Sequence, residues 1–327
     1  MTTNYPNGLS SFGMPLTGGG LPATSGKYIF VDATNGVDGN DGSSWEQAVK
    51  TVAQAYSMAR TNKDDVIVLS TYAQHELTAM LDVSKSRVHF TSQDVYGRFY
   101  GQRAKIYLPV LTTALATNVF TVKNTGVGNT FTGIKFYNDN TESATVATVG
   151  EGGEYAVYRN CEFYNSTNLT SNTVAELVLN GDSAQFFNCT FGSLADAVSG
   201  DKVRPAVLLT AGTVGTGLVS RDVLFDNCRF WKQAGGTTTS FIKGGATDVE
   251  RVMEFHDCQF IANPLGSAPA TAITVATLTV GIIALTGDTV AFKCTALATA
   301  TGVFSGLTTK TAAAHIALQA TNWAYIN

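Results

Sequence analysis

The chain has 327 residues, of which 14% are charged and 44% hydrophobic, and its formal net charge is −4. That hydrophobic content supports a large core and excludes a disordered polyelectrolyte. Lys and Arg form no cluster, so nothing in the sequence favours a nucleic acid or an anionic membrane as a partner. The five cysteines have neither CxxC nor Cys/His spacing, so we expect no zinc site, no disulfide framework and no cofactor.

Residues 1–26 are rich in Gly, Pro, Ser and Thr and contain no charge before Lys27. They lack a basic region followed by an apolar run, so we expect no signal peptide and synthesis in the cytoplasm. The composition predicts an extended arm that docks on a partner rather than a domain. Its predicted apolar anchors are Tyr5, Leu9, Phe12, Met14 and Leu16.

The next segment predicts a strand at 28–32, a helix at about 44–60 and a strand at 64–69. Ser43 and Glu46 have the spacing of a capping box at the start of the helix. Helical spacing also predicts one apolar face, made of Trp45, Ala48, Val49, Val52, Ala53 and Tyr56. Such a helix is suited to cover the end of a stack of strands.

Residues 158–260 repeat a six-residue phrase that reads aromatic, variable, Asn or Asp, Cys, variable, Phe. Its four copies are YRNCEF at 158–163, FFNCTF at 186–191, FDNCRF at 225–230 and FHDCQF at 255–260. An earlier segment, FTGIKF at 131–136, has Gly133 in the Asn position and Ile134 in the Cys position. Repeats at this spacing are typical of solenoids and related arrays.

The parity of the phrase predicts a strand, a one-residue corner and a second strand. Cys and the last Phe are two residues apart and share a face, whereas the leading aromatic residue has the wrong parity for one unbroken strand. Asn, Asp and Gly accept the left-handed backbone that such a corner needs. Stacked copies then form an internal ladder of Cys161, Cys189, Cys228, Cys258, Phe163, Phe191, Phe230 and Phe260.

These phrases resemble the coils of pectin-lyase-like proteins over roughly residues 27–262. The resemblance implies an all-β fold, a right-handed single-stranded parallel β-helix with an N-terminal capping helix, to which the extended arm is attached. Residues 263–327 lie beyond it, and from Pro264 onward only Asp288, Lys293 and Lys310 carry a formal charge. We therefore expect a low-charge C-terminal β segment that is buried between subunits.

The pectin-lyase-like family includes lyases and glycoside hydrolases, so the resemblance raises the question of a catalytic site. Hydrolysis needs converging carboxylates, and a lyase of this family would need clustered Asp with calcium and an Arg base. The position before each corner holds Arg159, Phe187, Asp226 and His256 in successive coils. Asp226 beside His256 is either an acid/base pair or an exposed ion pair, and Trp231 is either a sugar-stacking platform or a surface aromatic residue. We expect the ion pair and the surface residue, with no catalytic residue and no metal.

An arm, a solenoid and a low-charge end together resemble virion structural proteins of tailed bacteriophages, whose β-helices commonly form homotrimers. The resemblance implies a non-enzymatic capsid decoration or head-fibre protein on the virion surface, bound to the major capsid protein or another virion protein. The alternative is a tailspike-type β-helix that binds or cleaves a host surface glycan. A non-catalytic glycan-binding adhesin is a third reading.

Overall fold

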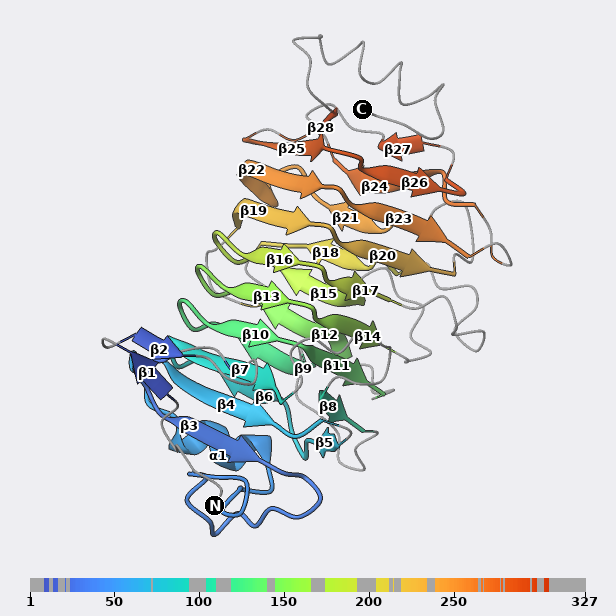
Figure 1. The fold of residues 1–327 in the computed structure, drawn as a ribbon. Coiled ribbons are helices and arrows are strands. Elements are labelled where there is room, and N and C mark those ends of the chain that lie inside the picture. Colours follow the sequence, from blue (N-terminus) through green and yellow to red (C-terminus); the bar gives the residue numbers. More distant parts are fainter. Residues whose placement is uncertain are drawn as a thin grey trace.

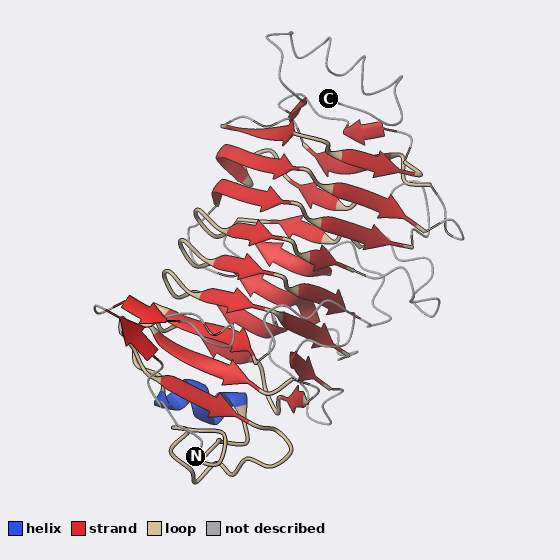
Figure 2. Cartoon of the chain, viewed as in Figure 1, coloured by secondary structure: helices blue, strands red, loops and turns tan. Residues whose placement is uncertain are grey.

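The computed structural model shows a solenoid in which the chain winds through three parallel sheets (Figure 1). It describes residues 9–11, 14–16, 21, 24–71, 73–93, 104–109, 119–139, 145–165, 174–192, 204–211, 214, 219–233, 239–263, 266, 268–276, 278, 280–294, 296–298 and 303–305. Strands account for nearly all of the regular structure (Figure 2). The predicted parallel β-helix is confirmed. In the described ranges, no helix has the length and apolar character needed to cross a bilayer.

From β4 to β27, each coil contributes one strand to each sheet, and β3 and β28 add to sheet I at the two ends. Sheet I contains β3 (Tyr28–Val31), β4 (Asp65–Leu69), β7 (Val88–Ser92), β10 (Thr130–Thr132), β13 (Val157–Arg159), β16 (Gln185–Phe187), β19 (Ser220–Asp226), β22 (Val249–His256), β25 (Gly281–Thr286) and β28 (Val303–Ser305). Sheet II contains β5 (Gln74–Glu76), β8 (Ala104–Leu108), β11 (Ile134–Asn138), β14 (Glu162–Asn165), β17 (Thr190–Phe191), β20 (Arg229–Lys232), β23 (Gln259–Ala262) and β26 (Val290–Phe292). Sheet III contains β6 (Leu81–Val83), β9 (Val119–Asn124), β12 (Thr145–Glu151), β15 (Ala175–Leu179), β18 (Val207–Leu209), β21 (Ile242–Gly244), β24 (Thr271–Val275) and β27 (Ala296–Ala298).

The predicted one-residue corner joins sheet I to sheet II in successive coils. The corner residues have positive φ: 67° at Gly133, 53° at Asn160 and Asn188, 49° at Asn227 and 50° at Asp257. Adjacent corners are also linked, because Asn227 Nδ2 donates to Asn188 Oδ1 over 2.6 Å. The left-handed backbone turns the chain without shifting the register of the strands on either side.

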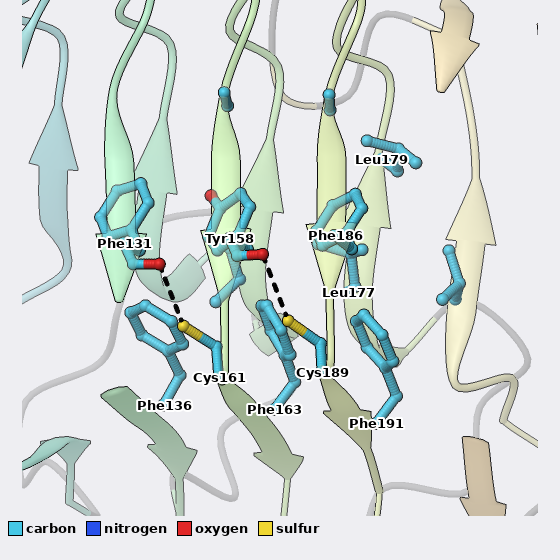
Figure 3. Close-up of a cluster of buried hydrophobic side chains, with 14 of the residues drawn as sticks. Phe131, Phe136, Tyr158, Cys161, Phe163, Leu177, Leu179, Phe186, Cys189 and Phe191 are labelled. Carbon is cyan, nitrogen blue, oxygen red and sulfur yellow. Dashed lines mark hydrogen bonds between the residues drawn. The ribbon is translucent and has the colours of Figure 1, made fainter. Parts of the chain in front are cut away.

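Two columns of aromatic rings fill the core where sheets I and II meet (Figure 3). The first column stacks Phe131, Tyr158, Phe186, Phe225 and Phe255 with ring centroids 4.6–5.0 Å apart. The second column stacks Phe136, Phe163, Phe191, Phe230 and Phe260. The columns meet edge to face, an arrangement that the ring quadrupoles favour.

The predicted cysteine ladder is confirmed, and each thiol also has a hydrogen-bond acceptor. Cys161 Sγ lies 3.4 Å from the carbonyl oxygen of Phe131, and Cys189 Sγ lies 3.6 Å from that of Tyr158, in each case one coil earlier (Figure 3). Cys228 and Cys258 continue the pattern toward Phe186 and Phe225. The four residues form no disulfide and are buried, so they act in packing.

The predicted helix is shorter than the sequence pattern indicates. Helix α1 spans Val52–Met58, and its N-cap is Thr51 rather than Ser43. The Asp38 carboxylate accepts hydrogen bonds from the backbone N–H of Lys50 and of Thr51, and Val49 forms a bridge with Val31 of β3. These tertiary contacts hold residues 49–51 in a non-helical backbone. The helix lies against β3 and β4 at the N-terminal end of the solenoid and buries Val52 and Ala55, whereas Ala53 is exposed.

Both ends of the chain contain described β-strands. In the arm, β1 (Leu9–Ser11) and β2 (Met14–Leu16) pair antiparallel, with Leu9 opposite Leu16. The anchors Tyr5 and Phe12 lie outside the described residues. Beyond residue 262, strands β24 to β28 continue the three sheets, so the solenoid itself extends into the low-charge segment. Residues 306–327 lie outside the described part.

Candidate functional site

The predicted row on sheet I is in register, but its polar contacts differ from the expected pair. Asp226 lies beside His256 on the adjacent strand, as the repeat predicts. However, His256 Nδ1 lies 2.9 Å from Thr286 Oγ1, and His256 Nε2 lies 3.4 Å from Asp257 Oδ2. Thr286 in turn donates to Glu254 Oε1 over 2.6 Å. His256 therefore contacts its chain neighbour Asp257 and Thr286 of the following coil. Its ring does not form the expected ion pair with Asp226.

The structure brings together a different set of charged residues, which sequence reasoning missed. Glu176 lies on β15, Arg204 precedes β18, and Lys232 ends β20. All three lie where sheet II leads into sheet III, and their side chains are only 4–5% exposed. We call them the buried charge cluster. They escaped notice because they stand outside the repeated phrase, although each is about one coil further along the chain than the previous one.

Distances within the buried charge cluster place its carboxylate between its two cations. Arg204 Nη2 lies 3.5 Å from Glu176 Oε1, and Lys232 Nζ lies 4.0 Å from Glu176 Oε2. Arg204 also donates to the backbone oxygen of Asn165 at the end of β14. No hydrogen-bond donor among the described residues reaches Glu176 Oε2. The cluster thus contains two cations, one anion and a buried acceptor atom that a bound group could engage.

Burial changes the acidity of the lysine in this cluster. It lowers the pKa of Lys232 to about 8, with a further lowering from the charge of Arg204, while Glu176 opposes the change. An amine with such a pKa is partly neutral near physiological pH, as a general base must be. The arrangement can therefore accept a proton at Lys232 Nζ while Arg204 keeps its charge.

Gly192 keeps the backbone close to the buried charge cluster. Its φ is +85°, and a Cβ atom there would lie 2.1 Å from the carbonyl oxygen of Trp231 and 4.0 Å from Glu176 Oε1. A side chain at this position would therefore collide with the backbone beside Lys232. The candidate glycan contact Trp231 lies at the same place, half-buried on the outer side of β20.

A second buried carboxyl group lies at the corner between sheets III and I. Glu151 accepts hydrogen bonds from Tyr158 Oη over 2.5 Å, from Asn124 Nδ2 over 2.8 Å and from the N–H of Gly153 over 2.7 Å. Burial raises the pKa of Glu151 to about 7, although these three donors oppose the change. Because the group is fully enclosed, we interpret it as a structural element of the corner.

A lyase of the family that the sequence resembles would hold calcium through clustered Asp side chains. In the described ranges, no group of three or more His, Cys, Asp or Glu side chains is placed to hold a metal ion. The described residues therefore do not fit such a site.

Solved structures with a similar fold include two lyases and a pectin methylesterase. A pectate lyase, Pel9A, is similar with a TM-score of 0.58 and 14% identity, over 85% of this chain and 68% of that chain. A rhamnogalacturonan lyase gives 0.51 and 13%, over 86% and 73%. The pectin methylesterase PemA from Erwinia chrysanthemi gives 0.50 and 11%, over 93% and 99%. No protein-family model and no curated protein matches the chain.

These neighbours correct one expectation. The sequence led us to expect a non-enzymatic protein, whereas the structures that share its fold carry the names of carbohydrate-active enzymes. At these identities the likeness establishes the pectin-lyase-like β-helix fold alone. The buried charge cluster, which the expectation did not include, is the candidate site that the fold positions.

Proposed function

We propose that the protein cleaves an acidic polysaccharide by β-elimination at the buried charge cluster. The observation that carries this proposal is Lys232, a buried lysine whose pKa is lowered to about 8 and which lies beside Arg204 and Glu176. With Lys232 neutral, Arg204 is the cation of the cluster that would pair with the carboxylate of a uronate sugar. The lyase names among the structural neighbours support the same class of reaction.

In the proposed step, the neutral amine of Lys232 takes the proton from the carbon next to the uronate carboxylate. The electron pair of that C–H bond forms a carbon–carbon double bond, and the bond to the glycosidic oxygen breaks with its pair remaining on oxygen. The leaving oxygen takes a proton from water. Arg204 stabilises the charge that develops on the carboxylate during proton removal. Glu176 orients the two cations and is a positioning residue.

The test is release of unsaturated products from polygalacturonate, followed by ultraviolet absorbance. Lys232→Arg keeps the charge beside Glu176 but removes the base, because a guanidinium does not lose its proton in proteins. We expect it to lose at least about a hundredfold in rate, the lower range for removing a general base. Lys63→Arg, at an exposed position, is the matched control. A Lys232→Arg protein that is folded and fully active would refute the proposed base, and the same follows if only saturated products are released.

We further propose that this activity belongs to a tailspike-type protein that acts on a host surface glycan. The support is the arm, which is uncharged before Lys27 and contains the β1–β2 hairpin. On this proposal residues 1–26 bind the capsid or another virion protein, and the low-charge C-terminal segment packs in a homotrimer. Deletion of residues 2–20 should abolish particle association and leave the solenoid folded. A truncated protein that still binds particles, or a monomer by light scattering, would contradict it.

A further inference from the structure

One carboxylate oxygen of the buried charge cluster is left as an acceptor for a ligand. The Glu176 side chain is 4% exposed, and no hydrogen-bond donor among the described residues reaches its Oε2 atom. Lys232 Nζ lies 4.0 Å from this atom, which is beyond the length of a hydrogen bond. A buried carboxylate oxygen without a donor costs free energy, so binding of a group that donates to it is favoured.

Contacts within the cluster determine which oxygen of Glu176 is left over. Arg204 Nη2 faces the other carboxylate oxygen, Oε1, at 3.5 Å. The backbone N–H of Glu176 donates to the carbonyl oxygen of Ala206 over 3.2 Å, which holds the residue at the start of β15. Oε2 is therefore the oxygen that faces Lys232, the proposed base.

The ligand group that suits Glu176 Oε2 is a hydroxyl. Esters, ethers and carboxylates have no proton to donate, and the charge of Glu176 would also repel a ligand carboxylate. A hydroxyl, in contrast, donates a short, charge-assisted hydrogen bond to an ionised carboxylate. The 4.0 Å between Oε2 and Lys232 Nζ allows one sugar ring to reach both atoms, with a C–H bond at the amine and a hydroxyl at the carboxylate.

We infer that Glu176 Oε2 accepts a hydrogen bond from a free hydroxyl of the uronate that is cleaved, and that the site rejects glycans acetylated on this hydroxyl. An acetyl group removes the donor and leaves the buried oxygen unpaired. For this reason, sites built to bind a hydroxyl discriminate strongly against analogues that lack it. In the free protein a water molecule can donate to the same oxygen, and the sugar hydroxyl replaces it. The inference rests on the proposed function for the identity of the sugar.

The test compares polygalacturonate with the same polymer acetylated on its free hydroxyls, at about pH 8, where about half of Lys232 is neutral. In the parent, acetylation should lower the rate of unsaturated product release at least about a hundredfold. In Glu176→Gln, Arg204 keeps the amide oxygen at the Oε1 position, so the NH2 group replaces Oε2 and cannot accept from a hydroxyl. The ratio of the two rates should then fall below about tenfold. Because both rates come from one protein, a general loss of activity cancels.

Binding to the parent provides a measurement that needs neither cleavage nor a variant. At about pH 5 Lys232 keeps its proton, so calorimetry reports the affinity for each intact polymer. The parent should bind the acetylated polymer at least about tenfold more weakly. The matched control for the rates is Glu162→Gln, because Glu162 is also buried but has Lys135 Nζ as a partner at 2.8 Å. Its ratio of rates should equal that of the parent.

The outcomes separate this inference from the proposed function. Equal affinities of the parent for the two polymers would overturn the hydroxyl contact even where the unacetylated polymer is cleaved. An unchanged ratio of rates in folded Glu176→Gln would overturn it as well. Selective binding of the unacetylated polymer, together with an active Lys232→Arg protein, would support the contact and refute the proposed base. If neither polymer binds, both proposals fail.

Discussion

The buried carboxyl group of Glu151 should make stability depend on pH in a direction opposite to that of most carboxylates. Burial raises its pKa from an ordinary value of 4.5 to about 7 in the folded protein. Below pH 4.5 the group is protonated in both states, and between these values the folded state binds more protons than the unfolded state. The contribution of Glu151 to stability is therefore greatest below pH 4.5 and is lost as the pH rises through 7. The difference corresponds to about 3 kcal/mol.

Replacing Glu151 by Gln keeps the size of the side chain and removes the titration. With its amide oxygen in the place of Oε2, the glutamine can accept from Asn124 and Tyr158, whereas the N–H of Gly153 loses its acceptor at every pH. We compare the unfolding free energy of Glu151→Gln with that of the parent at each pH. This difference should shift in favour of the variant by about 3 kcal/mol between about pH 4 and about pH 8. His75 opposes the trend in both proteins, because burial lowers its pKa and its contribution rises with pH. Because His75 is present in both proteins, its contribution cancels when their unfolding free energies are subtracted.

Urea unfolding at several pH values, followed by circular dichroism, measures this difference. The control is Glu76→Gln, which alters an exposed carboxyl group on β5. Its unfolding free energy should differ from that of the parent by the same amount at each pH. If the stability difference between Glu151→Gln and the parent stays constant from about pH 4 to about pH 8, the raised pKa is refuted.

Three further predictions concern the corner, the aromatic columns and the thiols. Asn227→Ala should cost about 1–2 kcal/mol in unfolding free energy because its φ is positive, and Asn227→Gly should cost less; equal losses would refute the strain. Phe225→Ala should cost about 3–5 kcal/mol, measured by urea unfolding, and a loss below about 1 kcal/mol would contradict its place in the core. Burial raises the pKa of Cys228 well above its ordinary value, so alkylation followed by mass spectrometry should modify it only after unfolding; rapid labelling of the native protein would contradict this.

The repeated phrase could be interpreted from the sequence because its information is local. In each coil, six residues set the parity of two strands and the corner between them, as at Asn188 and Cys189. The start of α1 could not be predicted in the same way. The capping-box spacing at Ser43 is a local signal, and it is overridden by Asp38, which binds the backbone of Lys50 and Thr51.

The candidate site was hidden from the sequence for a related reason. Glu176, Arg204 and Lys232 meet through the stacking of coils, and the chain between sheets II and III has no repeated phrase to align them. Trp231 stays a predicted glycan contact, and the structure adds that Gly192 lies against its carbonyl oxygen. Asp226 and His256 drew attention because they belong to the phrase, and the structure gives the histidine other partners.

The contrast between the two kinds of corner bears on how such a protein can diversify. In the five coils with corners from Gly133 to Asp257, sheet I passes to sheet II through one left-handed residue, so an insertion of one residue there would reverse the facing of the side chains that follow in the strand. Between sheets II and III, the chain length differs from coil to coil, as between Phe163 and Ala175 and between Phe191 and Val207. Insertions and deletions are tolerated at the second corner because the stacked rings lie outside it. Segments of new length can therefore be added beside Lys232 while the rest of each coil keeps its sequence pattern.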